Sequence, residues 1–122
     1  MASALLVFLG GGLGSLLRFG LGRWTVTIYP GFPLGTMIAN TLGAFLIGLL
    51  TLIFIDRNLL GSPYREMVLV GFLGGLTTFS SLCYESFVLY EAERWPALLI
   101  YVGTNVVVGF LLFLLGRQLG QI

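Results

Sequence analysis

The sequence contains no histidine and no lysine, and Cys83 is its only cysteine. Without an imidazole or an ε-amino group, His-based metal or acid–base sites and Schiff-base chemistry are excluded. A single thiol can neither close an intrachain disulfide nor build a metal cluster, so we expect Cys83 to be a small packing residue. No nucleophile is paired with a base in the sequence, and we expect no enzyme activity.

Charged residues are also scarce. They make up 9% of the 122 residues, whereas 57% are hydrophobic and the mean hydropathy is +1.02. Soluble domains carry roughly a quarter charged residues, so this composition predicts an integral membrane protein in contact with lipid. The formal net charge of +1 argues against nucleic acid as a partner and against a polybasic lipid anchor.

Four apolar runs are long enough to cross a bilayer, which takes about 20 helical residues. The run from Leu34 to Ile55 carries no charge, and the connection before it holds the turn-forming Pro30, Gly31 and Pro33. We therefore predict an all-α membrane protein, with residues 1–122 forming a single four-helix transmembrane domain. The expected spans cover about residues 3–23, 34–55, 67–90 and 97–117.

The arginines outside the membrane give little guidance on orientation. Four spans place both termini on one side, together with Arg57, Arg65 and Arg117, while Arg23 and Arg94 lie on the other side. This three-to-two division is too weak for positive charge to fix the orientation. We therefore predict that the chain inserts both ways up and forms an antiparallel, dual-topology homodimer.

The third apolar run differs from the others in composition. Residues 71–85 include three glycines and four hydroxyl residues, in a position where a simple span needs neither. Gly74-Gly75 directly before Leu76-Thr77-Thr78 predicts a break in the third helix. Such a break frees backbone carbonyl oxygens, which are preferred ligands of a hard monovalent cation.

Small residues recur four positions apart, a spacing that lets helix backbones approach closely. The pairs are Gly10 and Gly14, Gly11 and Ser15, Ala39 and Gly43, Ala44 and Gly48, and Gly71 and Gly75. Helix packing is a sufficient explanation for most of them.

A few polar side chains lie within the apolar runs, where they are costly and mark functional candidates. The Asn40 amide suits either a partly dehydrated anion or a hydrogen bond between helices, and Asn105 is a second amide in the fourth run. Arg18 either extends to the interface or lends positive potential to a vestibule, and Glu85 either caps its helix or carries a proton. Phe79, between two hydroxyl residues, can turn its positive ring edge toward an anion.

These residues fit a known pattern, and the sequence resembles the Fluc fluoride channels, also called the CrcB family, nearly end to end. The motifs are Gly14-x-x-x-Arg18, Gly35-Thr36-x-x-x-Asn40 and Gly71-x-x-Gly74-Gly75-x-Thr77-Thr78-Phe79-Ser80. The third motif is the most specific of the three.

The resemblance implies a dual-topology homodimer with two antiparallel pores that conduct fluoride out of the cytoplasm across the inner (plasma) membrane. It also implies a structural sodium ion at the dimer centre, held by the carbonyls of Gly74 and Thr77. The implied fluoride pathway comprises Arg18, Asn40, Phe79, Ser80, Ser81, Leu82, Tyr101 and Asn105. Leu82 stands where the family has the second of its two pore phenylalanines.

Two other functions compete with a passive fluoride channel. A small proton-coupled drug exporter also has four spans in antiparallel pairs, but it needs a carboxylate in its first helix. The first run here holds Arg18 and no acid. A structural membrane subunit would transport nothing.

Overall fold

The computed structural model describes residues 1–122, all of them in helices or short connections. The first two spans are α1 (Ala2–Ile28) and α2 (Leu34–Thr51), the latter continued by the π-helical turn η1 (Leu52–Asp56). The third is assembled from α3 (Ser62–Glu66), the π-helical η2 (Met67–Phe72), α4 (Leu73–Leu76) and α5 (Phe79–Glu91). The fourth comprises α6 (Trp95–Gly103), the π-helical η3 (Thr104–Val108) and α7 (Gly109–Gly120).

Four helical stretches are long and apolar enough to cross a membrane: Ala2–Ile28, Leu34–Asp56, Ser62–Glu91 and Trp95–Gly120. The prediction of an all-helical protein with four such helices is confirmed. The helices extend past the expected spans, because they continue through residues suited to the membrane interface, such as Trp24 and Glu66, beyond the purely apolar runs.

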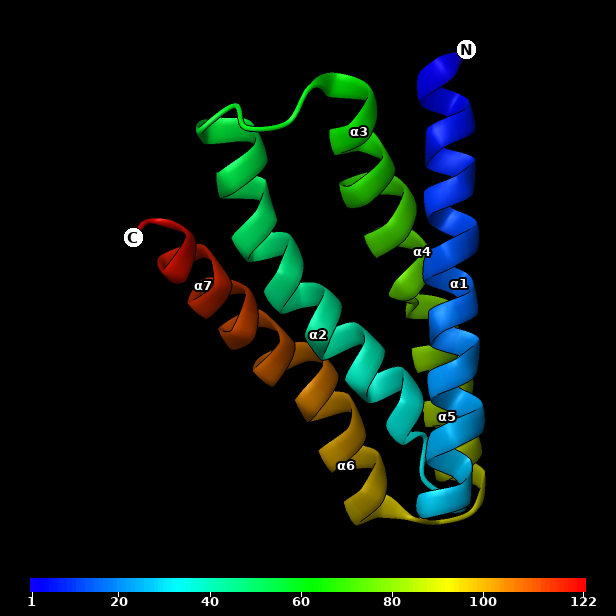
Figure 1. Ribbon diagram of the computed structural model, residues 1–122. Coiled ribbons are helices and arrows are strands. Elements are labelled where there is room, and N and C mark those ends of the chain that lie inside the picture. Colours follow the sequence, from blue (N-terminus) through cyan, green and yellow to red (C-terminus); the bar gives the residue numbers. More distant parts are fainter.

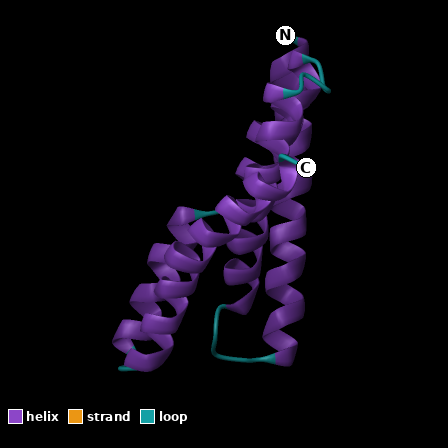
Figure 2. Cartoon of the chain, turned by 90° about the vertical axis from the view of Figure 1, so that its left-hand side faces the viewer, coloured by secondary structure: helices purple, strands orange, loops and turns teal.

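The helices pack as two pairs. Figure 1 shows α1 running along the third span, where it contacts η2 and α4, while α2 runs obliquely beside α7. Both termini lie toward the same end of the molecule as the connection between η1 and α3 (Figure 1, Figure 2). The connections at residues 29–33 and 92–94 lie at the opposite end, as an even number of spans requires.

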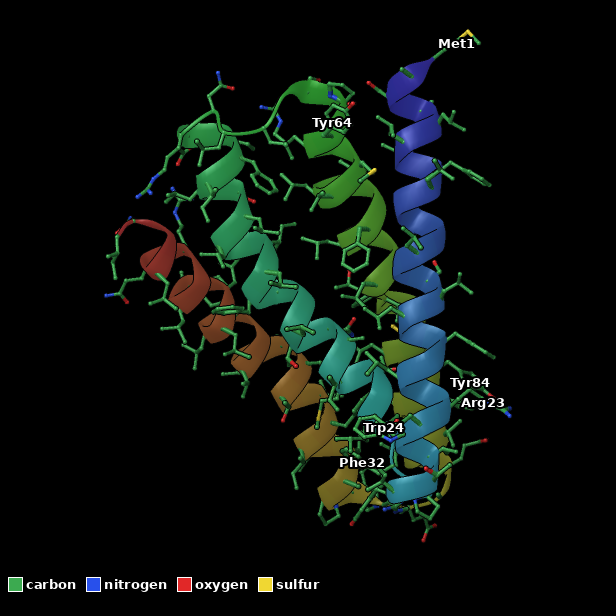
Figure 3. All side chains as sticks on the ribbon, viewed as in Figure 1. Met1, Arg23, Trp24, Phe32, Tyr64 and Tyr84 are labelled. Atoms are coloured by element: carbon green, nitrogen blue, oxygen red, sulfur yellow. The ribbon has the colours of Figure 1, made fainter.

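Aromatic side chains gather at one of these two ends. Trp24 and Phe32 lie at the end opposite to Met1 and Tyr64 (Figure 3). At the same end the rings of Tyr90 and Trp95 pack edge to face, with centroids 5.2 Å apart. Amphipathic aromatic rings favour the headgroup level, so this end carries most of the interfacial anchors of the chain.

Glycines make the closest backbone contacts in both helix pairs. A methyl group added at Gly14 would overlap the carbonyl oxygen of Phe72, and one at Gly75 would overlap that of Gly11. In the other pair, a methyl group at Gly48 would overlap the carbonyl oxygen of Phe113. The four-residue spacing of small residues therefore serves close helix packing, as expected for helices surrounded by lipid.

The chain on its own has little interior. Only 18 of its 122 residues are buried, and two small apolar clusters form the core. Ala39, Leu73 and Leu76 join α2 to α4, and Leu82, Leu89 and Tyr101 join α5 to α6. Most large apolar side chains point outward, so lipid or another chain must cover them.

Replacing Gly14 by alanine should loosen the contact between α1 and the third span. The added methyl group has no space beside Phe72, and overpacking of this kind costs roughly 1–3 kcal/mol. Gly12→Ala is the matched control, since nothing lies within 4 Å of the added carbon there. Thermal unfolding in detergent should show a lower Tm for Gly14→Ala alone, and equal Tm values for the two variants would contradict this packing.

Candidate functional site: the α4–α5 junction

The junction between α4 and α5 lies near the middle of the third span. Thr77 and Thr78 there have extended backbone, with ψ of 153° and 126°. Thr78 caps α5, because its Oγ1 accepts a hydrogen bond from the Ser81 N–H at 3.2 Å. Threonine is a favoured N-cap residue and the preceding Gly74-Gly75 is a weak helix former, so the local sequence favours a new helix start here.

Asn40 on α2 pairs with the junction at two points. Its Oδ1 accepts a hydrogen bond from the Thr78 N–H at 2.7 Å, and its Nδ2 donates to the Thr78 carbonyl at 3.1 Å. The same Nδ2 donates to Oδ1 of Asn105 at 2.8 Å, and Asn105 in turn donates to the carbonyl of Tyr101 at 2.8 Å. Both hydrogens of the Asn40 amide are therefore engaged within the chain.

Side chains from α1 hold the end of α4. The Gly75 carbonyl accepts hydrogen bonds from Arg18 Nε at 3.1 Å and from Ser15 Oγ at 3.4 Å. The carbonyl end of a helix carries partial negative charge, so the guanidinium of Arg18 is placed where it stabilises that end. Arg18 therefore contacts the junction itself.

The carbonyls of Gly74 and Thr77 lose the donors that an unbroken helix would supply. The Thr78 N–H, which would otherwise reach Gly74, goes to Asn40, and the Ser81 N–H, which would reach Thr77, goes to the Thr78 hydroxyl. The side of Gly74 where a side chain would stand is open, with no atom within 4 Å. The junction thus offers backbone oxygen atoms that are free to take another partner.

A mainly apolar groove of about 460 Å³ runs past the junction. It brings together six of the residues predicted as pathway or cation ligands, namely Asn40, Gly74, Thr77, Phe79, Leu82 and Asn105. Phe79, which lines this groove, is 77% exposed, whereas Leu82 is 8% exposed and packs into the core. Phe79 and Leu82 lie three apart on α5 and so face the same groove.

A second groove, of about 440 Å³, lies on the side of α1 and is lined mostly by polar residues. Arg18 and Ser81 from the predicted pathway line it, together with Ser15, Thr36 and Glu85. The predicted residues are therefore divided between two grooves. Ser80, which precedes Ser81 on α5, lines neither groove. It is exposed, and its hydroxyl oxygen lies 3.2 Å from that of Thr78.

Tyr101 lines neither groove. It is fully buried, and its hydroxyl donates a hydrogen bond to Glu85 Oε2. The other oxygen of Glu85 accepts from Thr36 Oγ1 at 3.0 Å, and Phe32 packs edge-on against the Tyr101 ring. Glu85 and Thr36 were absent from the predicted pathway. Their signals were a carboxylate inside an apolar run and a threonine four residues before Asn40.

No group of three or more His, Cys, Asp or Glu side chains comes together in the structure. The oxygen atoms that the junction itself presents are backbone carbonyls and the hydroxyl groups of Thr77 and Thr78. Such hard oxygen ligands suit alkali and alkaline-earth ions better than transition metals.

Residues 5–117 match the family described as "CrcB-like protein, Camphor Resistance (CrcB)". The chain belongs to the CrcB-like family. The resemblance inferred from the motifs is thereby confirmed, and the family assignment agrees with four helices that can span a membrane, so this CrcB-like chain is a multi-pass membrane protein.

Relatives cover the CrcB-like chain almost completely. The "Fluoride-specific ion channel FluC" of Thermus thermophilus is 46% identical over 117 residues, 95% of this chain and 91% of its own length. "Fluoride-specific ion channel FluC 2" of Symbiobacterium thermophilum is 41% identical over 111 residues, 90% of each chain. The "Fluoride-specific ion channel FluC" of Chloroflexus aurantiacus is 38% identical over 122 residues, 99% of this chain and 97% of its own length.

Tyr101→Phe should destabilise the CrcB-like chain, since it leaves the half-buried carboxylate of Glu85 without one hydrogen-bond donor. A hydrogen bond to a charged group contributes about 1.5–3 kcal/mol. Tyr84→Phe is the matched control, because Tyr84 is 69% exposed and lies on the outer surface (Figure 3). Thermal unfolding in detergent should show a lower Tm for Tyr101→Phe than for Tyr84→Phe, and the reverse order would contradict a structural role for the Tyr101 hydroxyl.

Proposed function

We propose that this chain is a passive fluoride channel that drains the ion from the cytoplasm across the inner (plasma) membrane. The observation that carries the proposal is its similarity, over nearly its whole length, to proteins named as fluoride-specific ion channels. Fluoride enters cells as its neutral acid and dissociates inside. A leak driven by the membrane potential then suffices to remove it, without a nucleotide or a coupled proton.

The two grooves supply the chemistry that a small, strongly hydrated anion needs. On the polar side, the Arg18 guanidinium gives positive potential and the Ser81 hydroxyl can replace water as a donor. The exposed hydroxyl of Ser80, the preceding residue on α5, can do the same outside the groove. On the apolar side, the exposed ring of Phe79 can present its positive edge, and Leu82 offers only methyl groups. The two grooves are lined by neighbouring residues of α5, Phe79 and Leu82 in the apolar groove and Ser81 in the polar one.

The remaining pathway residues act mainly by holding others in place. Asn40 can donate to fluoride only if it gives up a hydrogen bond to Thr78 or Asn105. The Tyr101 hydroxyl already binds Glu85, so Tyr101 influences the polar groove through that carboxylate. Asn105 lines the apolar groove beside Asn40 and fixes the direction of its amide.

The proposed functional unit is an antiparallel homodimer. The small interior, the exposed ring of Phe79 and the open side of Gly74 all leave the junction uncovered in a single chain. The weak division of arginines between the two ends favours insertion in both orientations. A second copy related by a two-fold axis in the membrane plane would bring the two junctions together.

A structural sodium ion is proposed at this meeting point, held by the Gly74 and Thr77 carbonyls of both chains. These two carbonyls have lost their helical donors, and the open side of Gly74 leaves space for an ion. Backbone oxygens are the ligands that a hard monovalent ion prefers. When bound, the ion would offset the partial negative charge of the two α4 ends.

Proton-coupled drug export receives no support from the geometry. The first span holds Arg18 and no carboxylate, and the carboxylate of the third span, Glu85, is engaged by Tyr101 and Thr36. Carrier chemistry of that type needs an acid that is free to exchange its proton with a substrate. A passive anion pathway needs none.

Purified protein in liposomes loaded with potassium fluoride should release fluoride when valinomycin allows potassium to follow, and chloride-loaded vesicles should release none. A fluoride electrode measures the rate. Phe79→Ile should slow release roughly five-fold, because an aromatic edge contact is worth about 1 kcal/mol. Phe8→Ile is the matched control, since Phe8 is similarly exposed but lies on α1, outside both grooves.

Fluoride retention by wild-type vesicles would overturn the channel proposal. Release that follows a proton gradient at zero voltage would instead favour a coupled carrier. Equal rates in Phe79→Ile and Phe8→Ile would remove Phe79 from the pathway.

Dual insertion should be visible by labelling a Ser62→Cys variant in a Cys83→Ser background, because Ser62 is the exposed first residue of α3, at the end of the molecule that holds the termini. An impermeant maleimide should label about half of the chains in intact cells and the remainder after permeabilisation, because neither orientation is strongly favoured. Labelling confined to one side would contradict the antiparallel dimer.

A further inference from the structure

We propose that Asn40 is a positioning residue for the cation site: its amide holds the α4–α5 junction in the one shape that leaves the Gly74 and Thr77 carbonyls free. The inference deepens the proposed function, because it makes one side chain on the anion pathway responsible for the geometry of the cation site. Loss of Asn40 should then impair cation binding as well as fluoride flux.

Asn40 and Thr78 are joined by a pair of hydrogen bonds. The side-chain amide offers an acceptor to the Thr78 N–H and a donor to the Thr78 carbonyl, as a neighbouring β-strand would. Extended backbone inside a membrane requires such partners, because lipid provides none. Asn40 therefore satisfies both polar groups of the residue that leaves the helix.

The direction of the amide is determined by the groups at either end of the network. The Thr78 N–H can only donate, so Asn40 must turn its oxygen toward it and its nitrogen toward the Thr78 carbonyl. The Tyr101 carbonyl can only accept, so Asn105 turns its nitrogen there and its oxygen toward Asn40. Asn105 thus locks Asn40 in its pairing orientation.

Asn40 Oδ1 and the Gly74 carbonyl are competing acceptors for the Thr78 N–H. In a continuous helix this group would donate to the Gly74 carbonyl, four residues earlier. Asn40 Oδ1 takes it instead, at 2.7 Å. Without that acceptor the Thr78 N–H is left with its ordinary helical partner, the Gly74 carbonyl, and a Gly74 carbonyl bonded within the helix is no longer available to an ion.

Tight packing on both sides of Asn40 holds α2 in a fixed position relative to the junction. Asn40 lies between two α2 residues that pack tightly against α4 and the junction: Ala39 is fully buried beside Leu73, and Gly43 leaves room for the Thr77 methyl group. These contacts fix α2 relative to the junction, so the amide is delivered to Thr78 in one position. A shorter or apolar side chain at position 40 cannot restore the pairing by a small shift.

The test measures cation binding without measuring flux. The Tm of the purified protein is recorded against sodium chloride concentration, with N-methyl-D-glucamine chloride keeping ionic strength constant. An ion that binds only the folded state raises the Tm. Wild type should show a saturable rise, and Asn40→Leu and Asn40→Ala should need about ten-fold more sodium to reach half of it, or show none.

Thr41→Val is the matched control. Thr41 follows Asn40 on α2, but its hydroxyl donates only to carbonyls of its own helix, Met37 and Ile38. It should keep the wild-type sodium dependence. Alanine and leucine differ in volume, so if one of them packs poorly at position 40 the other variant still tests the inference.

Three results would overturn the inference. If either Asn40 variant keeps the wild-type sodium dependence while losing fluoride flux, Asn40 acts on the anion alone and the channel proposal stands. Equal loss of sodium dependence in Thr41→Val would mean that α2 packing, and not the amide, is responsible. Absence of a sodium effect in wild type would remove the cation site and this inference together, and fluoride release from liposomes would still decide the channel function separately.

Discussion

Backbone groups in the interior of a membrane must find partners within the protein, and this constraint governs the centre of the molecule. A continuous helix meets it automatically, whereas the two extended residues Thr77 and Thr78 do not. Side chains supply partners to this break from three directions. Asn40 on α2 pairs with the N–H and carbonyl of Thr78. Arg18 and Ser15 on α1 donate to the Gly75 carbonyl, and the Thr78 hydroxyl accepts from the Ser81 N–H. Polar side chains from two other helices thus converge on this one irregular segment.

Close packing of glycines is what brings those partners within reach. Gly14 and Gly75 let α1 lie directly on the third span, and this contact places Arg18 one turn further along, against the Gly75 carbonyl. Gly43 has the same effect on α2, where it allows Thr77 to approach and Asn40 to reach Thr78. Substitution of these glycines would therefore alter the site as well as the packing.

Apolar runs and the spacing of small residues were sufficient to predict four helices and their close contacts, because both features depend on local sequence and on lipid as the solvent. The division of the polar residues into two grooves could not be predicted. It depends on how far α5 rotates after the junction, which places Phe79 and Leu82 on one side and Ser81 on the other. The pairing of Tyr101 with Glu85 likewise joins residues 16 apart across a turn between helices, beyond the reach of helix periodicity.

The concentration of aromatic rings at one end has a consequence for how the protein matches its bilayer. Trp24 lies at that end (Figure 3), together with the paired rings of Tyr90 and Trp95, and such rings favour the headgroup level. Tyr64 lies at the other end (Figure 3), next in sequence to the charged residues Arg65 and Glu66. Two chains oriented the same way would anchor strongly in one leaflet and weakly in the other. An opposed pair gives each leaflet one strong anchor, so changes in bilayer thickness would act on both halves alike and leave the midplane of the assembly at the midplane of the membrane.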